Sequence, residues 1–287
     1  FTQNEKICID EIKGVYKNLE LLAEPVLVHR AQALCYAWIY LDDHGLEEID
    51  VQMTYVHLDT EMIKRFRETM TREELESWYQ RLLDSYHKWL SYQMKWREER
   101  NRSMEKLEFP FIYRKGQKEM VAGIYHAISR KEQIFIQAPS GVGKTMSAVF
   151  PAVRSIGEGK AETLFYLTAR TITRTVAQDA FEILRKNGLL FKTVTITAKE
   201  KLCFCEKPEC NPETCPYAKG HYDRINDAVY ELWTNEQSFD RETILRQAEK
   251  WQVCPFEMSL DLSVWMDAVI CDYNYVFDPN VYLKRFF

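Results

Sequence analysis

The sequence lacks the features that would assign it to a membrane, to the secretory pathway or to the strongly basic proteins that coat nucleic acid. None of its apolar runs is long enough to cross a bilayer, and its first residues do not have the pattern of a signal peptide. Its formal net charge is −5, so any contact with DNA would have to use a local basic groove. Without an export signal, a framework of disulfides is not expected either.

What is present is the composition of a folded protein of moderate size. A length of 287 residues predicts about two domains, each large enough for its own core. Hydrophobic residues make up 46% of the chain and charged residues 28%, which predicts a soluble, globular protein. The aromatic residues are numerous, and most of them are expected in the core.

The clearest motif is a glycine-containing loop between an apolar run and a segment of helical character. It consists of Ala138-Pro139-Ser140-Gly141-Val142-Gly143-Lys144-Thr145. With Ile134–Ile136 as a strand before it and a helix after it, this order predicts a P-loop, in which backbone N–H groups and a helix N-terminus bind phosphate. Lys144 would reach the β- and γ-phosphates and Thr145 would ligate Mg²⁺. Ala138 stands where the strict pattern has glycine.

Five of the eight cysteines gather in an irregular stretch that is rich in proline and glutamate. They are Cys203, Cys205, Cys210, Cys215 and Cys254. Such a stretch cannot bury much apolar surface, so a bound metal would supply the missing cohesion. Thiolates prefer Zn²⁺ or an iron–sulfur cluster. The stretch has none of the Cys-x-x-Cys pairs usual for structural zinc, but spacing alone leaves both metals open.

The first 107 residues carry a weaker pattern. Lys6–Lys13 is predicted to be a strand, on which Ile7, Ile9, Glu11 and Lys13 share one face because side chains alternate. The spacing of Glu11 and Lys13 is that of metal-dependent nucleases, where a carboxylate holds Mg²⁺ or Mn²⁺ and a lysine steadies the attacking water or the phosphate. The same spacing also occurs in ordinary charged strands.

A helix predicted over His29–Tyr40 adds to this pattern, because it places Gln32 and Tyr36 one turn apart on the same face. A Gln-x-x-x-Tyr pair after a Glu-x-Lys strand resembles the RecB-type branch of the PD-(D/E)XK nucleases. The resemblance implies that Glu11 binds the metal and that Glu11 and Lys13 are catalytic. A strand over Ile49–Leu58 and a long helix from Thr60 onward complete the predicted order.

One departure from the nuclease family leaves an alternative open. The family's metal-binding Asp, which precedes the Glu-x-Lys strand, has no counterpart among the few residues before Lys6. The segment could therefore be a structural or truncated α/β domain, in which Glu11 and Lys13 are merely paired or solvated.

The residues before the P-loop give a second, more specific resemblance. Phe-Pro-x-x-Tyr-Arg-x-x-Gln, which ends at Gln117, is followed by the Ala-Pro-Ser-Gly-x-Gly-Lys-Thr loop, as in the XPD/DinG branch of superfamily-two helicases. In that family Ala commonly replaces the first glycine. The resemblance implies that Gln117 recognises adenine. It also implies that Thr168, Arg170 and Thr171, at the end of a strand over Thr163–Leu167, contact the phosphates of single-stranded DNA without reading its sequence.

The same resemblance bears on the cysteines. In that family four cysteines inserted before motif II hold a 4Fe–4S cluster, which implies the ligands Cys203, Cys210, Cys215 and Cys254, with Cys205 as the alternate for Cys210. Zinc and free thiols are the alternatives. Residues 272–279 resemble the segment just before motif II, but no Asp-Glu-Ala-His follows. We therefore expect either a longer polypeptide or a chain that alone binds nucleotide weakly and unwinds nothing.

These patterns predict an α/β protein with a P-loop, a RecA-like parallel sheet and a Cys-rich iron–sulfur insertion, preceded by a small α/β nuclease-like domain. The predicted ranges are 1–107 for an incomplete nuclease-type domain, 108–200 for the first motor domain, 201–260 for the cluster insertion and 261–287 for the return to the motor domain.

The family implies an ATP-dependent 5′→3′ DNA helicase, with ATP, Mg²⁺ and a 4Fe–4S cluster as cofactors and Mn²⁺ or Mg²⁺ at the nuclease-like site. Its partners would be single-stranded DNA and DNA junctions in repair or recombination, in a bacterial-type, nucleoid-associated cytoplasm. Two other classes stay open. One is a metal-dependent nuclease with a regulatory P-loop domain, and the other is a zinc-stabilised DNA-binding module without enzymatic activity.

Overall fold

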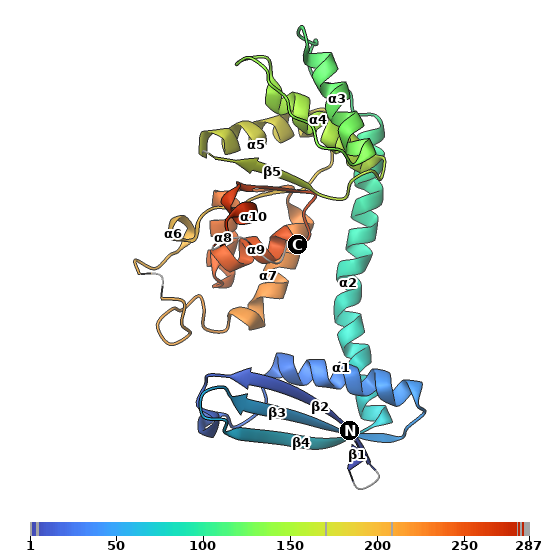
Figure 1. The fold of residues 1–287 in the computed structure, drawn as a ribbon, viewed down its shortest axis with the longest axis vertical. Helices are drawn as coiled ribbons and strands as arrows, with labels where there is room; N and C mark the ends of the chain where they lie inside the picture. Colours follow the sequence, from blue (N-terminus) through green and yellow to red (C-terminus); the bar gives the residue numbers. More distant parts are fainter. Residues whose placement is uncertain are drawn as a thin grey trace. The chain divides into compact units, whose positions relative to one another are not determined.

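The computed structural model describes residues 2–3, 6–169, 171–207, 209–279, 281 and 283 (Figure 1). The chain divides into two compact units, residues 1–90 and 91–287, called unit 1 and unit 2 below. The division falls within the long helix α2 (Arg72–Glu105), whereas the sequence pattern placed the domain boundary at 107. The reason is that one continuous helical periodicity runs through both units, so the sequence shows no break at residue 90.

Unit 1 is built on a mixed sheet with the strand order β1-β2-β3-β4. Strands β2 and β3 are parallel, and the other neighbours are antiparallel. The structure confirms the strands predicted at 6–13 and 49–58 and the helix predicted at 29–40. The elements are β1 (Thr2–Gln3), β2 (Lys6–Val15), the 3-10 turn η1 (Leu19–Leu21), α1 (Leu27–Asp43), β3 (Glu48–His57), β4 (Ile63–Thr71) and the start of α2.

The helix predicted from Thr60 onward is wrong in its first part, because residues 63–71 form strand β4. Every second residue from 64 to 70 is half-buried and the residues between them are exposed, which is the period of a strand. Antiparallel pairing with β3 then outweighs the helical propensity of the charged residues. Helix α2 begins at Arg72, where the Glu74 carboxylate accepts the Thr71 N–H at 2.9 Å and caps the first turn.

Helix α1 covers one face of this sheet (Figure 1). The buried side chains of α1 and β3 that form the core are Ala33, Leu34, Ala37, Leu41, Ile49, Val51, Met53 and Tyr55. The opposite face is polar, and there Asp50 accepts hydrogen bonds from Arg67 and from Thr69, each at 2.6 Å. Because side chains alternate, this register places Glu11 and Lys13 on one face, as predicted, and that face is the α1 side of the sheet.

Unit 2 contains a parallel sheet with the strand order β5-β8-β6-β7, which confirms a mixed α/β fold with a parallel sheet. Helices α4 and α5 lie on one side of β5, and α8 and α9 lie on the other (Figure 1). After α2 the elements are α3 (Gln117–Arg130), α4 (Lys144–Gly157), β5 (Leu164–Thr168), α5 (Thr171–Lys186), β6 (Thr193–Thr195), α6 (Lys199–Leu202), α7 (His221–Asn235), β7 (Ser238–Phe239), α8 (Arg241–Trp251), α9 (Pro255–Ser263), β8 (Ala268–Asp272) and α10 (Asn274–Phe277). Within the described ranges, every helix is too short or too polar to span a bilayer.

The strand predicted over Ile134–Ile136 is not formed, and this prediction is wrong. The run lies in an irregular segment between α3 and α4, and Phe135 is 94% exposed. A strand exists only where a neighbouring strand pairs with it, and in the described part of unit 2 no strand pairs with this run. Its apolar residues show strand propensity, but propensity without a partner does not decide the structure.

A buried carboxylate joins the last turns of α2 to the sheet of unit 2. Asp267, just before β8, accepts hydrogen bonds from Arg100 at 2.5 Å, from the Trp96 indole at 3.0 Å and from the Lys192 backbone N–H at 2.8 Å. The Lys192 ammonium donates to the carbonyls of Trp233 and Glu236 at the end of α7, and it lies 4.3 Å from the centre of the Trp96 ring. Burial lowers the pKa of Lys192 to about 8.

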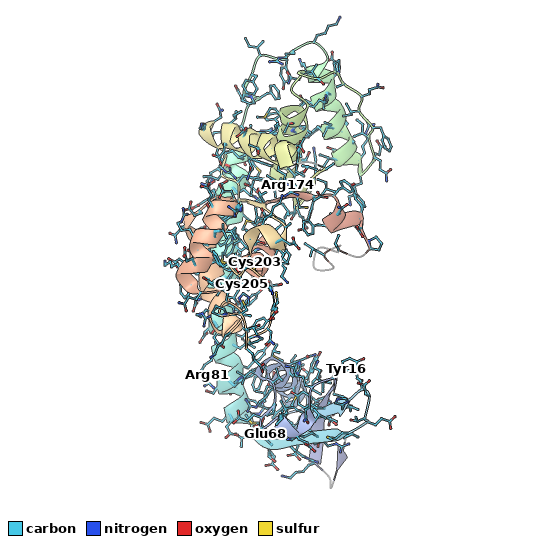
Figure 2. All side chains as sticks on the ribbon, turned by 90° about the vertical axis from the view of Figure 1, so that its left-hand side faces the viewer. Tyr16, Glu68, Arg81, Arg174, Cys203 and Cys205 are labelled. Carbon is cyan, nitrogen blue, oxygen red and sulfur yellow. The ribbon has the colours of Figure 1, made fainter. Side chains whose placement is uncertain are left out.

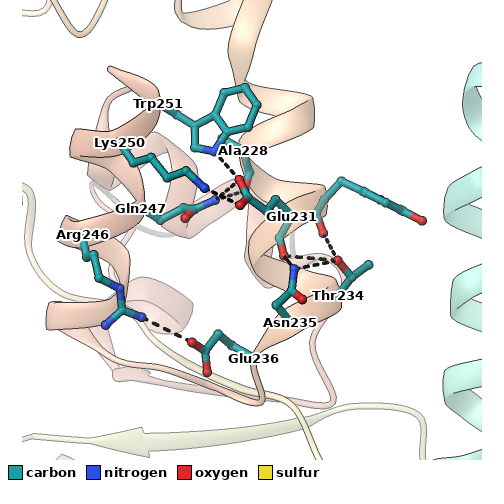
Figure 3. A network of polar contacts seen from close by, with 10 residues as sticks. Ala228, Glu231, Thr234, Asn235, Glu236, Arg246, Gln247, Lys250 and Trp251 are labelled. Atoms are coloured by element: carbon teal, nitrogen blue, oxygen red, sulfur yellow. Dashed lines mark hydrogen bonds and ion pairs between the residues drawn. The ribbon is translucent and has the colours of Figure 1, made fainter.

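A second polar cluster joins helices α7 and α8 (Figure 3). The Glu231 carboxylate on α7 accepts hydrogen bonds from Lys250, from the Trp251 indole at 2.6 Å and from Gln247 at 3.3 Å. The Gln247 amide also donates to the Ala228 carbonyl at 3.0 Å. The bond from Lys250 is the main reason why the pKa of Glu231 lies below its ordinary value. These hydrogen bonds hold α7 and α8 together in addition to their apolar packing.

Candidate functional site

The glycine-containing loop between α3 and α4 has the backbone geometry of an anion-binding turn. Gly141 and Gly143 have φ angles of 83° and 81°, a conformation that L-residues rarely adopt. Gly143 is the N-cap of α4, so the first N–H groups of this helix are free for a ligand. The Lys144 ammonium folds back over the loop and donates to the carbonyls of Ala138 at 3.0 Å and Pro139 at 2.9 Å.

The predicted adenine-binding segment lies directly against this loop. Gln117 is buried, its side-chain oxygen accepts the Arg114 N–H at 3.0 Å, and its amide nitrogen would lie 2.7 Å from a β-carbon added at Gly143. The Arg114 guanidinium donates to the Gly141 carbonyl. Next to them the Phe109 and Tyr113 rings stack, 4.3 Å apart and inclined by 13°. The aromatic residues, Gln117 and the loop therefore form one site, although the sequence separates them.

The residues predicted to contact DNA are only partly described. Thr168 ends β5 opposite Asp272 and is buried, so its side chain is covered. Arg170 lies outside the described residues, and of Thr171 the structure describes only that it begins α5.

Sequence reasoning missed Arg174, which follows one turn later on α5 (Figure 2). Its guanidinium lies 3.5 Å from the Asp272 carboxylate and donates to the Ile196 carbonyl at 3.4 Å. Its helical spacing from residues 170 and 171 was the signal that could have identified it.

All five clustered cysteines line one cavity of about 310 Å³. Cys203 and Cys205 are labelled in Figure 2 and are close enough for a hydrogen bond, and the Cys205 and Cys215 sulfurs are 3.8 Å apart. This contact is the largest cause that raises the pKa of Cys205 to about 11. On another wall Lys199 lies close to Cys210, and their hydrogen bond raises the pKa of Lys199. Burial raises the pKa of Cys254.

The frame of this cavity comes from helices on either side of the irregular segment. Cys203 follows α6, and Cys254 is the N-cap of α9, where its N–H donates to Nδ1 of His221 at 3.2 Å. Accepting this bond requires the tautomer that carries its proton on Nε2. Burial lowers the pKa of His221, which favours the neutral form. The helices thus place two of the thiols, and the turns of residues 204–217 place the others.

A set of five thiols around one cavity suits a thiophilic metal centre in its chemistry. In the part of the chain that the structure describes, however, no three His, Cys, Asp or Glu side chains converge closely enough to hold a single metal ion.

Two family models match unit 2. The model described as DEAD/DEAH box helicase matches residues 114–210, and the model described as DEAD_2 matches residues 185–285. The first range contains the P-loop, and the second contains the cysteine cavity. Over residues 114–285, unit 2 is therefore similar in sequence to the helicase domains that these models describe.

Two curated relatives also carry a helicase name. They are the regulator of telomere elongation helicase 1 homologs of Caenorhabditis briggsae and Caenorhabditis elegans, each 22% identical to this chain. The alignments cover 223 and 219 residues, which are 62% and 61% of this chain. The chain covers only 22% of the length of each relative.

Unit 1 lies outside both family ranges, and there the predicted nuclease-type residues form a connected cluster. The Lys13 ammonium lies 2.7 Å from the Glu11 carboxylate and donates to the Gln32 side chain at 3.0 Å. The Gln32 amide in turn donates to the Tyr36 hydroxyl at 3.3 Å. The structure thus brings together all four residues that the sequence pattern selected.

A fifth residue of this cluster was missed. Nδ1 of His29, on α1 one turn before Gln32, lies 3.2 Å from the Tyr55 hydroxyl, which accepts the Val26 N–H. The direction of the bond between Tyr55 and His29 depends on the tautomer of the imidazole. Burial and the nearby Lys13 lower the pKa of His29, so the ring is neutral at pH 7.

Proposed function

We propose that unit 2 is the nucleotide-binding motor domain of an ATP-dependent, 5′→3′ DNA helicase of the XPD/DinG type. It would act on single-stranded DNA and DNA junctions in repair or recombination. The observation that carries the proposal is the proximity of Gln117 to Gly143, which supports a shared site for the predicted adenine-recognising residue and the predicted phosphate loop. The helicase family ranges and the helicase names of the relatives support the same function.

The geometry suggests how the chain's own residues would bind ATP. The Lys144 ammonium would exchange its bonds to the Ala138 and Pro139 carbonyls for bonds to the β- and γ-phosphates, which are stronger, charged acceptors. The N–H groups at the start of α4 would bind the phosphate oxygens, and the Thr145 hydroxyl would ligate Mg²⁺. The Gln117 amide, whose oxygen is held by the Arg114 N–H, would recognise the base.

The test is equilibrium binding of Mg-ATP to the chain by calorimetry. Lys144→Ala removes a charge-assisted contact worth about 1.5 to 3 kcal/mol and should weaken binding at least about tenfold. Gln117→Ala should weaken the binding of ATP more than it weakens the binding of a triphosphate without adenine. Lys186→Ala, at an exposed position near the end of α5, is the matched control. Equal affinities for the chain and for Lys144→Ala would exclude a functional P-loop.

Polarity needs a separate experiment on the full-length protein. We expect it to unwind a duplex with a 5′ single-stranded tail and to leave a duplex with only a 3′ tail intact. Preference for the 3′ tail would contradict the proposed direction without affecting nucleotide binding.

We propose a 4Fe–4S cluster at the thiol cavity, with Cys203, Cys210, Cys215 and Cys254 as its ligands. The support is that all four line one cavity at the junction of α6, α7 and α9. When bound, the cluster would supply a rigid cross-link for residues 203–217 rather than a catalytic step. Iron and acid-labile sulfide in the anaerobically purified protein, with a broad visible absorbance band, would support it. A colourless protein loaded with zinc would refute it.

A second function is favoured by the cluster in unit 1. We propose that Glu11 and Lys13, positioned by Gln32 and Tyr36, act in metal-dependent DNA cleavage. The test is Mn²⁺-dependent cleavage of single-stranded DNA, which Lys13→Ala should abolish. Lys6→Ala is the control, because Lys6 pairs with Glu48 at 2.7 Å on the other face of the sheet. Cleavage that persists in Lys13→Ala would assign unit 1 a structural role.

A further inference from the structure

The thiol cavity holds one cysteine more than a four-ligand cluster uses. Cys205 is the surplus thiol under the proposed ligand set, yet it is not remote from the others, because its sulfur lies 3.8 Å from that of Cys215. It is also close enough to Cys203 for a hydrogen bond. Cys205 is thus a neighbour with which the Cys215 sulfur could form a bond instead of binding a metal.

The geometry favours Cys215 over Cys203 as the partner of Cys205 in a covalent bond. The sulfurs of Cys205 and Cys215 would need to approach by less than about 2 Å to reach disulfide length. Residues 206–214 separate the two cysteines, and residues 203–207 lie outside any helix or strand, so the backbone can follow. A bond between Cys203 and Cys205 would close a ring over a single residue, which is stiff and strained.

We propose that Cys205 and Cys215 form a reversible disulfide when the cavity holds no metal, and that this bond controls loading of the cluster. The proposal rests on the cluster assigned above, because the disulfide occupies one proposed ligand, Cys215. The oxidant is a low-molecular-weight disulfide of the glutathione type. Reduction returns both thiols, and only then is the four-cysteine set complete.

The exchange is balanced in atoms and electrons. The thiolate of one cysteine attacks a sulfur of the external disulfide, forms a mixed disulfide and releases one external thiolate. The second cysteine, already in contact, loses its proton to solvent and attacks the protein sulfur of the mixed disulfide. The Cys205–Cys215 bond forms and a second external thiolate leaves. Two protein thiols are oxidised by two electrons, and one external disulfide is reduced to two thiols.

The test uses the full chain, freed of metal and equilibrated with glutathione disulfide. Free thiols are then alkylated and the peptides are mapped by mass spectrometry. We expect a peptide that links Cys205 to Cys215, with two of the eight cysteines protected from alkylation. A map with only glutathione adducts, or with Cys205 joined to another cysteine, would overturn the proposal. This map needs no variant, so it stands even if a substitution impairs folding.

Iron uptake tests the control function. Each protein is reconstituted with iron and sulfide after oxidation, with and without a reductant, and the two iron contents are compared. We expect the reductant to restore uptake several-fold in the wild-type chain and to change little in Cys205→Ser. Cys35→Ser, a half-buried thiol of unit 1, should behave as wild type. If iron uptake by Cys205→Ser depended on the reductant as much as uptake by the wild-type chain, the disulfide would not control loading of the cluster. Absence of iron from the reduced wild-type chain would instead refute the cluster itself, and the peptide map would still decide the disulfide.

Discussion

The phosphate loop and the thiol cavity belong to the same unit but are held in different ways. The loop is fixed by its own backbone, with two left-handed glycines and bonds from Arg114 and Lys144 to loop carbonyls. Its neighbour Gln117 is buried against it. The thiol cavity has a frame in α6, α7 and α9, but its segment 204–217 is held largely by turns between near neighbours, such as the Cys215 N–H bonded to the Asn211 carbonyl at 2.8 Å.

The loop is therefore already in its binding conformation, whereas the segment of the thiol cavity needs its ligand to be fully ordered. A preformed loop loses little conformational entropy on binding, so its affinity depends on a few polar contacts. A segment of turns loses more, so it is ordered mainly by what it binds. We therefore expect substitutions near the loop to change affinity and those in the frame of the cavity to change stability.

The largest effect is expected where the sheet supports both regions. Asp267→Ala leaves the buried Arg100 without its carboxylate and should destabilise unit 2 by about 3 to 5 kcal/mol. Asp179→Ala, at an exposed position on α5, is the control and should have no measurable effect. The measurement is urea unfolding followed by tryptophan fluorescence. If Asp267→Ala lost ATP binding without a loss of stability, the common support of the two regions would be disproved.

The next effect is a pH dependence of the stability of unit 2, caused by Lys192, whose ammonium bonds to carbonyls at the end of α7. Because burial lowers the pKa of Lys192 to about 8 from 10.5, the unfolded chain holds this proton more tightly. Stability should therefore rise as the pH increases from about 8 to about 10.5, by an amount on the order of 3 kcal/mol. Lys192→Met should remove this rise, and Lys186→Met should retain it. A rise that is the same in both variants would show that other groups cause it.

A smaller effect is expected at the loop alone. Gly143→Ala adds a left-handed strain of about 1 to 2 kcal/mol and pushes on the Gln117 amide, so affinity for ATP should fall about tenfold. Gly159→Ala is the matched control, because Gly159 has a φ of 70° but nothing within 4 Å of an added β-carbon. Calorimetry with Mg-ATP measures both. An unchanged affinity in Gly143→Ala would show that the loop is not preformed.

The smallest effect is expected between α7 and α8. Hydrogen bonds from Lys250 and Trp251 lower the pKa of Glu231, so they stabilise the fold above the carboxylate's ordinary pKa, and this contribution is lost as the pH falls through the lowered value. Glu231→Gln should reduce stability at pH 7 by less than about 1 kcal/mol, because the carboxylate is partly exposed. Glu249→Gln, at an exposed position on α8, is the control. Thermal unfolding at pH 7 and pH 4 should show a smaller pH difference for Glu231→Gln than for the control.

The two regions also differ in how far the sequence could predict them. The loop motif, Gln117 and the cysteine group were all recognisable, because residue types at characteristic positions along the chain identify them. The contact between Gln117 and Gly143 follows from the packing of α3 on α4, which no local pattern states. His29 was missed for the same reason, since its hydrogen bond is to Tyr55, which lies far away in sequence.

The amino-acid sequence by itself determined the helices with clear periodicity, the glycines that permit the phosphate loop and the set of thiols available to a metal. These depend on the period of the side chains and on backbone sterics, which are local. Only the tertiary structure decided that residues 63–71 form a strand, that Ile134–Ile136 do not, and that Cys205 lies beside Cys215. Strand pairing and sulfur contacts join residues that the chain brings together only when it folds.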